Sequence, residues 1–277
     1  LTIHVTDTRN NFVDTITGVE SLRFDDGDIG VSQDANGMVL TGSNGPDSIQ
    51  VVGSIPITIE AGSGDDTIEG DTVDDLIFGQ DGDDIIDGNA GDDTITGGAG
   101  DDTIDGGDDT DIAIFAGNQA DYTFESSTDG LTITITDTVN NYVDTVTGVE
   151  TLRFDDGDIT VSHDTSLNQL VLTGDTTGDN ITIVGSVPVT VYGDEGDNII
   201  VGGSGDDTIE AGAGDDTIDG GDGDDAIEAG AGDDTIEGGD GDDYIDGWSG
   251  NDVIDGGAGD DEILGYDGDD TIDGGAG

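Results

Sequence analysis

A repeat of nine residues constrains the fold of this chain more than any other feature. From Ala61 the sequence reads AGSGDDTIE, GDTVDDLIF, GQDGDDIID and three further copies, the last ending at Ile114. Nine more copies run from Gly193 to Asp273 without an insertion or deletion. Position six is Asp in fourteen of the fifteen copies, and position eight is Ile in fourteen. So short a period predicts a solenoid in which each copy is one small structural unit.

A second, longer repeat has a period of about 130 residues, because Leu1–Asp34 returns as Leu131–Asp164 with 26 of 34 positions identical. Alternation in LTITITD and turn residues in FDDGDI predict short strands and hairpins in these segments. No segment shows a helical period. The chain is therefore expected to hold two tandem units, each a non-repetitive β segment followed by a nonapeptide block. The expected division is 1–60 and 115–192 for the two β segments and 61–114 and 193–277 for the two blocks.

The composition excludes several kinds of partner and site. Three Lys plus Arg against 68 Asp plus Glu give a formal net charge of -65, which excludes nucleic acid and anionic membranes as electrostatic partners. There is no Cys, so neither a disulfide framework nor a thiolate metal site is available. No apolar run approaches the roughly 18 residues of a membrane span. The sequence begins without Met and stops inside a motif, which is expected of a fragment of a larger protein.

The nonapeptides match the pattern GGxGxDxUx, where U is a large apolar residue, and in this they resemble the RTX (hemolysin-type) calcium-binding repeats. The resemblance covers the two blocks and repeats in register. It implies that GGxGxD forms a turn, that xUx forms a short strand, and that two nonapeptides make one coil. The implied fold is all-β: blocks of right-handed parallel β-roll (an RTX solenoid) alternating with short non-repetitive β segments.

The residue types suit calcium. Glycines at positions one, two and four permit positive φ, so that backbone carbonyl oxygens can turn toward an ion. The Asp at position six adds a carboxylate, and its counterpart 18 residues later should lie about 4.8 Å away, one strand spacing. Carbonyl and carboxylate oxygens from two loops give an all-oxygen site, which suits calcium better than magnesium, with on the order of ten ions in the chain.

The candidate calcium ligands fall into rows with a spacing of 18 residues. In the first block the expected rows are Asp66, Asp84 and Asp102 on one edge, and Asp75, Asp93 and Asp111 on the other. In the second block they are Asp215, Asp233, Asp252 and Asp270 on one edge, and Asp207, Asp225, Asp243 and Asp261 on the other, with Asp216 and Asp234 as further candidates.

Three departures from the motif weaken particular sites. Val73 replaces the Gly at position four, and a β-branched residue tolerates positive φ badly, so the loop that holds Asp75 is a doubtful site. Asp109 occupies the same position beside Asp111, and Asn198 removes a charge at the start of the second block. The Asp residues at position five are expected to point outward and to serve solubility.

Two minor features stand out. Trp248 and Tyr266 both occupy position two, 18 residues apart, and are expected to form a small exposed aromatic patch. This patch is either a tolerated loop substitution or a contact for a glycan or partner. Arg23 and Arg153 recur in VExLRF in a chain nearly devoid of positive charge, and each is expected to pair with a nearby Asp.

The resemblance implies a chain that stays unfolded at low calcium, passes through a type I secretion channel and folds outside the cell. The favoured function is a structural or adhesive repeat module of a bacterial surface, biofilm, S-layer-like or filament protein, with self-association or a glycan as further partners. The alternative is the secretion and folding tail of an exported enzyme. No HExxH or GxSxG motif occurs here, so catalysis is not expected in this chain. Ice binding is disfavoured, because positions three and five lack regular Thr or Asn rows.

Overall fold

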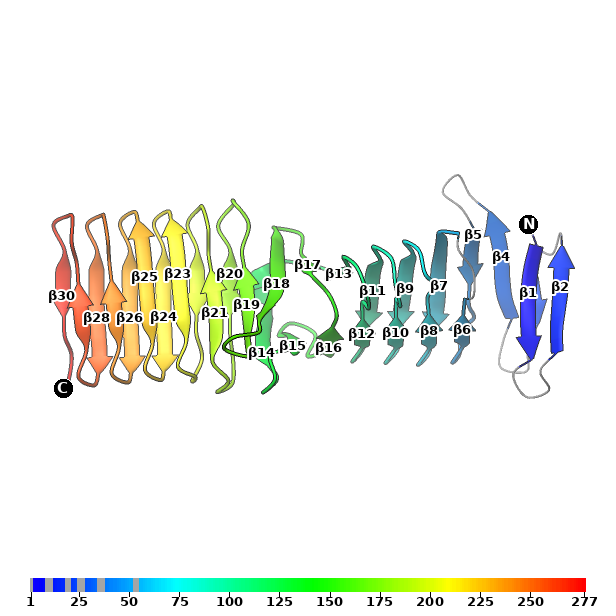
Figure 1. The fold of residues 1–277 in the computed structure, drawn as a ribbon, viewed down its shortest axis with the longest axis horizontal. Helices are drawn as coiled ribbons and strands as arrows, with labels where there is room; N and C mark the ends of the chain where they lie inside the picture. The colour runs from blue at the N-terminus through cyan, green and yellow to red at the C-terminus, as the bar shows by residue number, and fades with distance from the viewer. Residues whose placement is uncertain (1, 8–11, 18–20, 24–27, 34–37, 52–54) are drawn as a thin grey trace.

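The computed structural model describes residues 2–7, 12–17, 21–23, 28–33, 38–51 and 55–277, with the side chains placed from residue 38 onward and at a few earlier positions. The described chain forms an elongated stack of short strands that lie across the long axis (Figure 1). Its one helical segment is the 3₁₀ turn η1 (Gln119–Asp121). Among the described residues no helix is long and apolar enough to cross a membrane.

One face of the stack is a continuous sheet of fifteen strands that passes through both units. In spatial order it consists of β29 (Glu262–Leu264), β27 (Tyr244–Asp246), β25 (Ala226–Ala231), β23 (Thr208–Ala213), β21 (Val189–Tyr192), β19 (Gln169–Thr173), β18 (Asp158–Asp164), β17 (Thr151–Arg153), β13 (Ile112–Ile114), β11 (Thr94–Ala99), β9 (Leu76–Asp81), β7 (Ile57–Ser63), β5 (Met38–Thr41), β4 (Asp28–Gln33) and β3 (Ser21–Arg23).

The remaining strands form three sheets. One has seven strands: β14 (Tyr122–Ser126), β15 (Thr132–Asp137), β16 (Val143–Thr147), β12 (Thr103–Asp105), β10 (Ile85–Asp87), β8 (Thr67–Glu69) and β6 (Ser48–Gln50). Another has six: β20 (Asn180–Thr182), β22 (Ile199–Val201), β24 (Thr217–Asp222), β26 (Thr235–Asp240), β28 (Val253–Ala258) and β30 (Thr271–Asp273). The last is the antiparallel pair of β1 (Thr2–Asp7) and β2 (Phe12–Thr17).

Within the nonapeptide blocks, partner strands are parallel and 18 residues apart. Ile68 pairs with Ile86, and Ile86 pairs with Ile104, while Ile77 pairs with Ile95 in the long sheet. Consecutive nonapeptides therefore supply strands to opposite faces, and two of them complete one coil. The parallel β-roll predicted from the sequence is confirmed.

The core is a double file of apolar side chains between the two faces. Each three-residue strand turns only its middle residue inward, because side chains alternate across a strand. Ile86 is 1% exposed, for example, while its neighbour Ile85 is 55% exposed. The strict recurrence of Ile at position eight is thus the recurrence of the one inward side chain of each strand.

The non-repetitive segment of the second unit is built into the stack. Its strands β14, β15 and β16 form an antiparallel meander, and β16 then adds in parallel to β12 of the first roll. Strand β17 adds to β13 in the same way, and β19 leads in parallel into β21 of the second roll. Coils also extend beyond the nonapeptide blocks: β6 pairs with β8, and the division between residues 60 and 61 falls inside β7.

Aromatic side chains fill the core where this segment interrupts the file of Ile. Phe154 lies at the centre, with ring-centroid distances of 5.5 Å to Phe115, 5.1 Å to Tyr122 and 6.1 Å to Phe124. The Tyr122 hydroxyl donates a 2.6 Å hydrogen bond to the carbonyl oxygen of Ala116. The meander therefore has its own small core, continuous with that of the rolls.

Replacing an inward Ile with Ala should show how much the burial of that side chain contributes to stability, as distinct from the chemical change itself. Ile86→Ala is expected to destabilise the calcium-loaded chain by about 2–5 kcal/mol, because it leaves a cavity between the two sheets. The adjacent Ile85→Ala makes the same chemical change on an exposed side chain and should cost well under half as much. Chemical denaturation at fixed calcium measures both, and equal losses would contradict this description of the core.

Candidate metal centre

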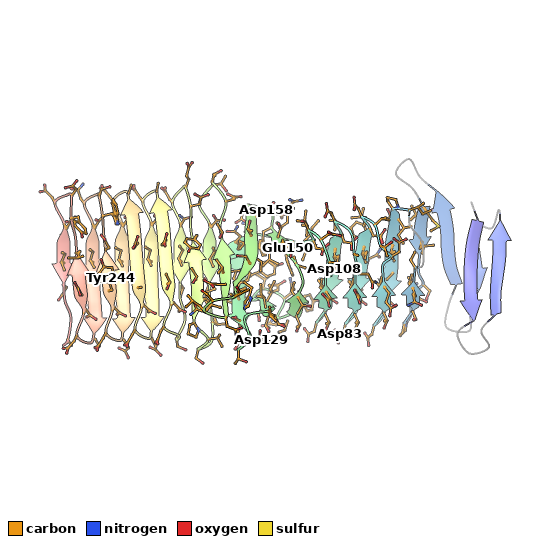
Figure 2. All side chains as sticks on the ribbon, in the orientation of Figure 1. Asp83, Asp108, Asp129, Glu150, Asp158 and Tyr244 are labelled. Atoms are coloured by element: carbon orange, nitrogen blue, oxygen red, sulfur yellow. The ribbon has the colours of Figure 1, made fainter. Side chains whose placement is uncertain are left out.

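Each position-six Asp lies immediately before a strand and accepts a backbone hydrogen bond from the coil before it. The amide N–H of Asp207 donates to Oδ1 of Asp225 at 2.7 Å, and that of Asp225 donates to Oδ1 of Asp243 at 2.9 Å. The carboxylates therefore form rows along the stack, with a step of 18 residues. Other side chains project outward along both loop edges of the stack (Figure 2). One oxygen of each carboxylate is used in holding neighbouring coils together.

Four such rows run through the described residues, and they contain the predicted ligands together with residues that the sequence did not indicate. The first roll has Asp47, Asp66, Asp84, Asp102 and Asp144 in one row, and Asp75, Asp93, Asp111 and Glu150 in the other. The second roll has Asp179, Asn198, Asp216, Asp234, Asp252 and Asp270 in one row, and Asp207, Asp225, Asp243 and Asp261 in the other.

The second carboxylate oxygen of most of these residues is buried without a partner. Oδ2 has no hydrogen bond in Asp66, Asp84, Asp93, Asp102, Asp111, Asp207, Asp216, Asp225, Asp234, Asp243, Asp252 and Asp261. A buried carboxylate oxygen that lacks a donor is costly, because it has lost water and gained nothing in return. A row of such atoms in one chain indicates that bound cations complete this fold.

The surroundings of Oδ2 are also oxygen-rich. A methyl group added to Gly220 would lie 2.5 Å from Oδ2 of Asp225 and 2.5 Å from the carbonyl oxygen of Gly238 in the next coil. At Gly88 the same two distances, to Asp93 and to Gly106, are also 2.5 Å. The missing side chain of position one thus leaves a space toward which a carboxylate and a carbonyl oxygen of the adjacent coil both turn.

Asn198 shows what this space requires. Its Oδ1 accepts the N–H of Asp179 at 2.8 Å, as an Asp would. Its Nδ2, which replaces the second carboxylate oxygen, donates to the carbonyl oxygens of Gly196 and Ala211 at 3.0 and 3.1 Å. An amide group can satisfy these carbonyl oxygens, whereas a carboxylate oxygen in the same place repels them unless a cation lies between.

The donor set fits calcium. Among the described residues no three acidic or His side chains converge on one point, so any site must combine about one carboxylate per coil with backbone carbonyl oxygens. Calcium accepts such flexible sets of six to eight oxygens, while magnesium demands a tight octahedron and retains water. When bound, the ion supplies the positive charge that the unpartnered Oδ2 atoms and the converging carbonyl oxygens lack.

In three loops a backbone N–H of the same loop satisfies the second carboxylate oxygen. Oδ2 of Asp47, Asp75 and Asp179 accepts the N–H of the residue four places earlier, which is position two of a nonapeptide or its equivalent outside the blocks, at 2.6, 3.1 and 2.8 Å respectively. The three donors are Ser43, Asp71 and Asp175, none of which has positive φ, whereas Gln80, Asn89, Trp248 and Tyr266 at the same position do. The backbone conformation at position two therefore decides whether Oδ2 is satisfied internally.

The loop with Val73 is one of these. The N–H of Val73 donates to Oδ1 of Asp71 at 3.1 Å, and the chain there avoids positive φ at Val73. Asp75 accordingly has no unpartnered oxygen, in line with the doubt attached to it from the sequence. Asp109, in contrast, adopts φ 85°, and Oδ2 of the following Asp111 stays unpartnered.

The predicted row Asp215, Asp233, Asp252 and Asp270 is wrong in its first two members. Asp216 and Asp234 continue that row toward Asp252 and Asp270, with hydrogen bonds of 2.8, 3.0 and 3.0 Å. Asp215 and Asp233 are position-five residues, and because neighbouring side chains of an extended chain alternate in direction, they lie exposed in an outer row. There the N–H of Asp233 donates to Oδ1 of Asp215 in the preceding coil at 2.8 Å.

The ends of the rows use residues that the nonapeptide pattern does not contain. The N–H of Asp102 donates to Asp144 at 2.8 Å, and that of Asp111 donates to Oε2 of Glu150 at 2.9 Å. At the start of the second roll, Nε2 of Gln119 donates to Oδ1 of Asp179 at 2.8 Å. The sequence signal available for these residues was their place in the longer repeat, where Asp144 and Glu150 match Asp14 and Glu20.

Burial raises the pKa of the inner carboxyl groups, and neighbouring carboxylates raise it further. The pKa of Asp93 and of Asp225 reaches about 7, and that of Asp84 and of Asp234 about 6, against backbone hydrogen bonds that act in the opposite direction. The pKa of Asp102 also rises to about 7, mainly through burial. Without a cation, the folded roll therefore disfavours the charged form of these carboxyl groups near neutral pH.

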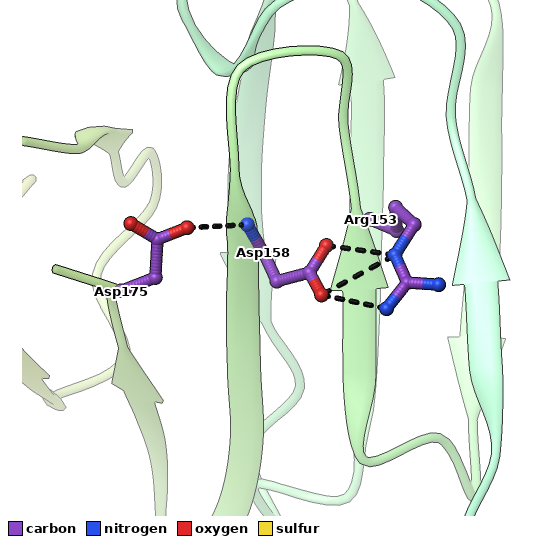
Figure 3. A network of polar contacts seen from close by, with 3 residues as sticks. All are labelled: Arg153, Asp158 and Asp175. Carbon is purple, nitrogen blue, oxygen red and sulfur yellow. Dashed lines mark hydrogen bonds and ion pairs between the residues drawn. The ribbon is translucent and has the colours of Figure 1, made fainter. Parts of the chain in front are cut away.

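Arg153 forms the expected ion pair. Its Nε and Nη2 donate to the two oxygens of Asp158 at 2.9 and 2.7 Å, and the Asp158 N–H donates to Asp175 at 3.1 Å (Figure 3). The pairing raises the pKa of the guanidinium group. The network ties the turn between β17 and β18 to the first loop of the second roll. The side chain of Arg23 lies outside the described residues.

Trp248 and Tyr266 are 56% and 66% exposed, and both adopt positive φ, 61° and 60°. Trp248 borders a shallow hollow of about 250 Å³ that is also lined by Glu210, Glu228 and Gly230. Both side chains that the sequence predicts to form an aromatic patch are thus exposed.

The comparison with protein families agrees with this geometry. The model described as RTX calcium-binding nonapeptide repeat (4 copies) matches residues 60–95, 78–113, 192–227, 219–254 and 249–277, which together are more than half of the chain. The chain belongs to the RTX calcium-binding nonapeptide repeat family. No curated protein matches it. The roll is thus a calcium-binding repeat module, and the ion count and the individual ligands are matters for proposal.

One solved structure with a match is the extracellular lipase LipA from Serratia marcescens. The two are 22% identical, with a TM-score of 0.23, over 75% of this chain and 33% of the lipase chain. This RTX chain therefore spans a third of the length of that enzyme.

The raised pKa values predict that acid partly replaces calcium. An acid whose pKa is higher in the folded than in the unfolded chain stabilises the fold below its unfolded pKa, and this contribution disappears as the pH rises through the folded pKa. In EDTA, β structure should therefore increase as the pH falls from about 7 to about 4, as measured by far-UV circular dichroism. A calcium-free chain whose β signal stays constant or falls across this range would contradict the assignment.

Asn198 suggests a sharper test. Asp225→Asn should stabilise the calcium-free roll, because Nδ2 can donate to the carbonyl oxygens that Oδ2 faces, and should reduce the number of ions bound. The neighbouring Asp224→Asn removes the same charge from an exposed position and should change neither by much. Urea unfolding with and without calcium, together with equilibrium dialysis, distinguishes the two, and identical behaviour of both variants would count against the assigned site.

Proposed function

We propose that this chain is a structural repeat module of a secreted bacterial surface or filament protein, folded by calcium after export. The observation that carries the proposal is the file of buried, unpartnered Oδ2 atoms along a stack that continues from one unit into the next. The ligands proposed are Asp66, Asp84, Asp93, Asp102, Asp111, Asp207, Asp216, Asp225, Asp234, Asp243, Asp252, Asp261 and Asp270.

Calcium dependence follows from the balance of charges. Carboxylates in adjacent coils repel each other and face carbonyl oxygens, so that the calcium-free roll carries an electrostatic penalty in every coil. Each site contributes about 4 kcal/mol when free calcium is 1,000 times its dissociation constant. A chain exported through low calcium into a calcium-rich medium would therefore fold at its destination, which suits passage through a type I secretion channel.

The extended architecture favours a scaffold. The fifteen-strand sheet passes through the non-repetitive segment of the second unit without a break, so that further units of the same kind would lengthen one rod. The exposed outer rows of Asp at position five give that rod an acidic surface on which calcium can bridge neighbouring chains. Trp248 and Tyr266 offer an aromatic surface for a glycan or a protein ligand.

The alternative is that the chain is the folding and export tail of an enzyme. The calcium chemistry would be the same, and the two proposals differ in what the folded chain does with its neighbours. A scaffold module is expected to associate with other copies when calcium is present, while a tail needs only to fold.

A calcium titration from EDTA tests both statements. Far-UV circular dichroism should show cooperative formation of β structure with calcium and little with equal magnesium. Light scattering and electron microscopy of the same samples should then show ordered assemblies. Unchanged β structure in EDTA at neutral pH would refute calcium-driven folding, and calcium-folded chains that stay monomeric at all concentrations would favour the tail.

A further inference from the structure

The junction between the first roll and the following meander repeats the arrangement of a coil without repeating its sequence. In the roll, the N–H of Asp93 donates to Oδ1 of Asp111, 18 residues later, at 2.8 Å. At the junction the N–H of Asp111 donates instead to Oε2 of Glu150, 39 residues later, at 2.9 Å. Glu150 thus occupies the place of the next position-six Asp in this row.

The carbonyl oxygen of the next coil is also replaced. In the roll, a methyl group on Gly88 would meet Oδ2 of Asp93 and the carbonyl oxygen of Gly106. A methyl group on Gly106 would lie 2.7 Å from Oδ2 of Asp111 and would collide with the carbonyl oxygen of Gly148. Gly148 follows directly after β16 of the meander, and its carbonyl oxygen lies where the next coil of the roll has that of a position-one glycine, although Gly148 itself has φ +59°.

Asp111 itself requires a positive partner. Its side chain is completely buried, with 0% exposure, and Oδ2 has no hydrogen-bond partner. Glu150 brings a second carboxylate close to Asp111, since its Oε2 accepts the Asp111 N–H, and Asp92 and Asp109 are further acidic neighbours. Arg153 cannot supply the charge, because its guanidinium group is engaged with Asp158.

We propose that Asp111, the carbonyl group of Gly148 and Glu150 form a calcium site at the junction, which fastens the meander to the roll that precedes it. The inference rests on the proposed calcium function of the roll and extends it to residues outside the repeats. The set contains carboxylate and carbonyl oxygens only, as calcium prefers. The amides of Glu150 and Thr151 both donate to the carbonyl oxygen of Asp111, at 3.2 and 3.1 Å, so they report whether the junction is closed.

The site gives calcium a second role at this position. Within the roll an ion joins coils that are already covalently consecutive. At the junction it joins two segments whose contacting residues are separated by the whole meander, and it therefore couples the folding of one unit to the next. Without an ion, repulsion between Asp111 and Glu150 should open the junction before the coils of the second roll unfold.

The test uses the full chain and Glu150→Gln, which keeps an acceptor for the Asp111 N–H and removes the charge. Glu125→Gln is the control, because Glu125 is an exposed acid of the same meander. Adding calcium should slow the hydrogen exchange of Thr151 at least tenfold less in Glu150→Gln than in the wild type, because the variant lacks both the repulsion that opens the calcium-free junction and one charged ligand. In Glu125→Gln the calcium effect on Thr151 should equal that in the wild type, and amides of Thr208–Asp240 should respond to calcium alike in all three proteins.

The outcomes separate the two proposals. Equal calcium dependence of Thr151 in Glu150→Gln and wild type overturns the junction site while leaving the roll sites intact. Absence of any calcium effect on Thr208–Asp240 in the wild type refutes the proposed function itself. If Glu150→Gln does not fold, Glu150→Asp supplies the test: the shortened carboxylate keeps the repulsion but reaches the ion less well, so it should raise the calcium requirement of Thr151, and a wild-type response overturns the proposal.

Discussion

The whole stack depends on the different roles of the two oxygens of a position-six carboxylate. One oxygen accepts a backbone N–H from the preceding coil and fixes the register, as in the 2.7 Å bond from Asp207 to Asp225. The other is buried beside a glycine and a carbonyl oxygen and has no internal partner. The same carboxylate that makes the hydrogen bond between coils therefore also needs a cation. For this reason folding and ion binding are coupled.

The exceptions make the same point. Asn198 satisfies the carbonyl oxygens with its own amide, and Asp75 is satisfied by the N–H of Asp71. Gln119 donates to the first carboxylate of the second roll, where no preceding coil exists to do so. Each of these is a local solution for a position at which the regular pattern begins or is interrupted. Where the pattern is regular, Oδ2 has no such donor and needs a bound ion.

The sequence predicted the roll well because its period and its geometry coincide: a step of 18 residues is one coil, so Asp66, Asp84 and Asp102 follow from counting. Prediction failed where the step differs. Asp47 and Asp179 are reached by 19 residues, Asp144 by 42 and Glu150 by 39. Asp215 and Asp233 were misplaced by a single residue, which in an extended chain is enough to exchange an inner for an outer side chain.

The rows also have a direction. Wherever a next coil follows, the position-six N–H donates toward it, and neighbouring strands of a roll are parallel. One end of a stretch of roll therefore offers amide donors and the other offers carboxylate acceptors. Two like ends cannot complete each other's bonds. End-to-end association that continues these rows would therefore be heterologous. A rod that continued these rows would have a single polarity, and its two ends would be chemically distinct.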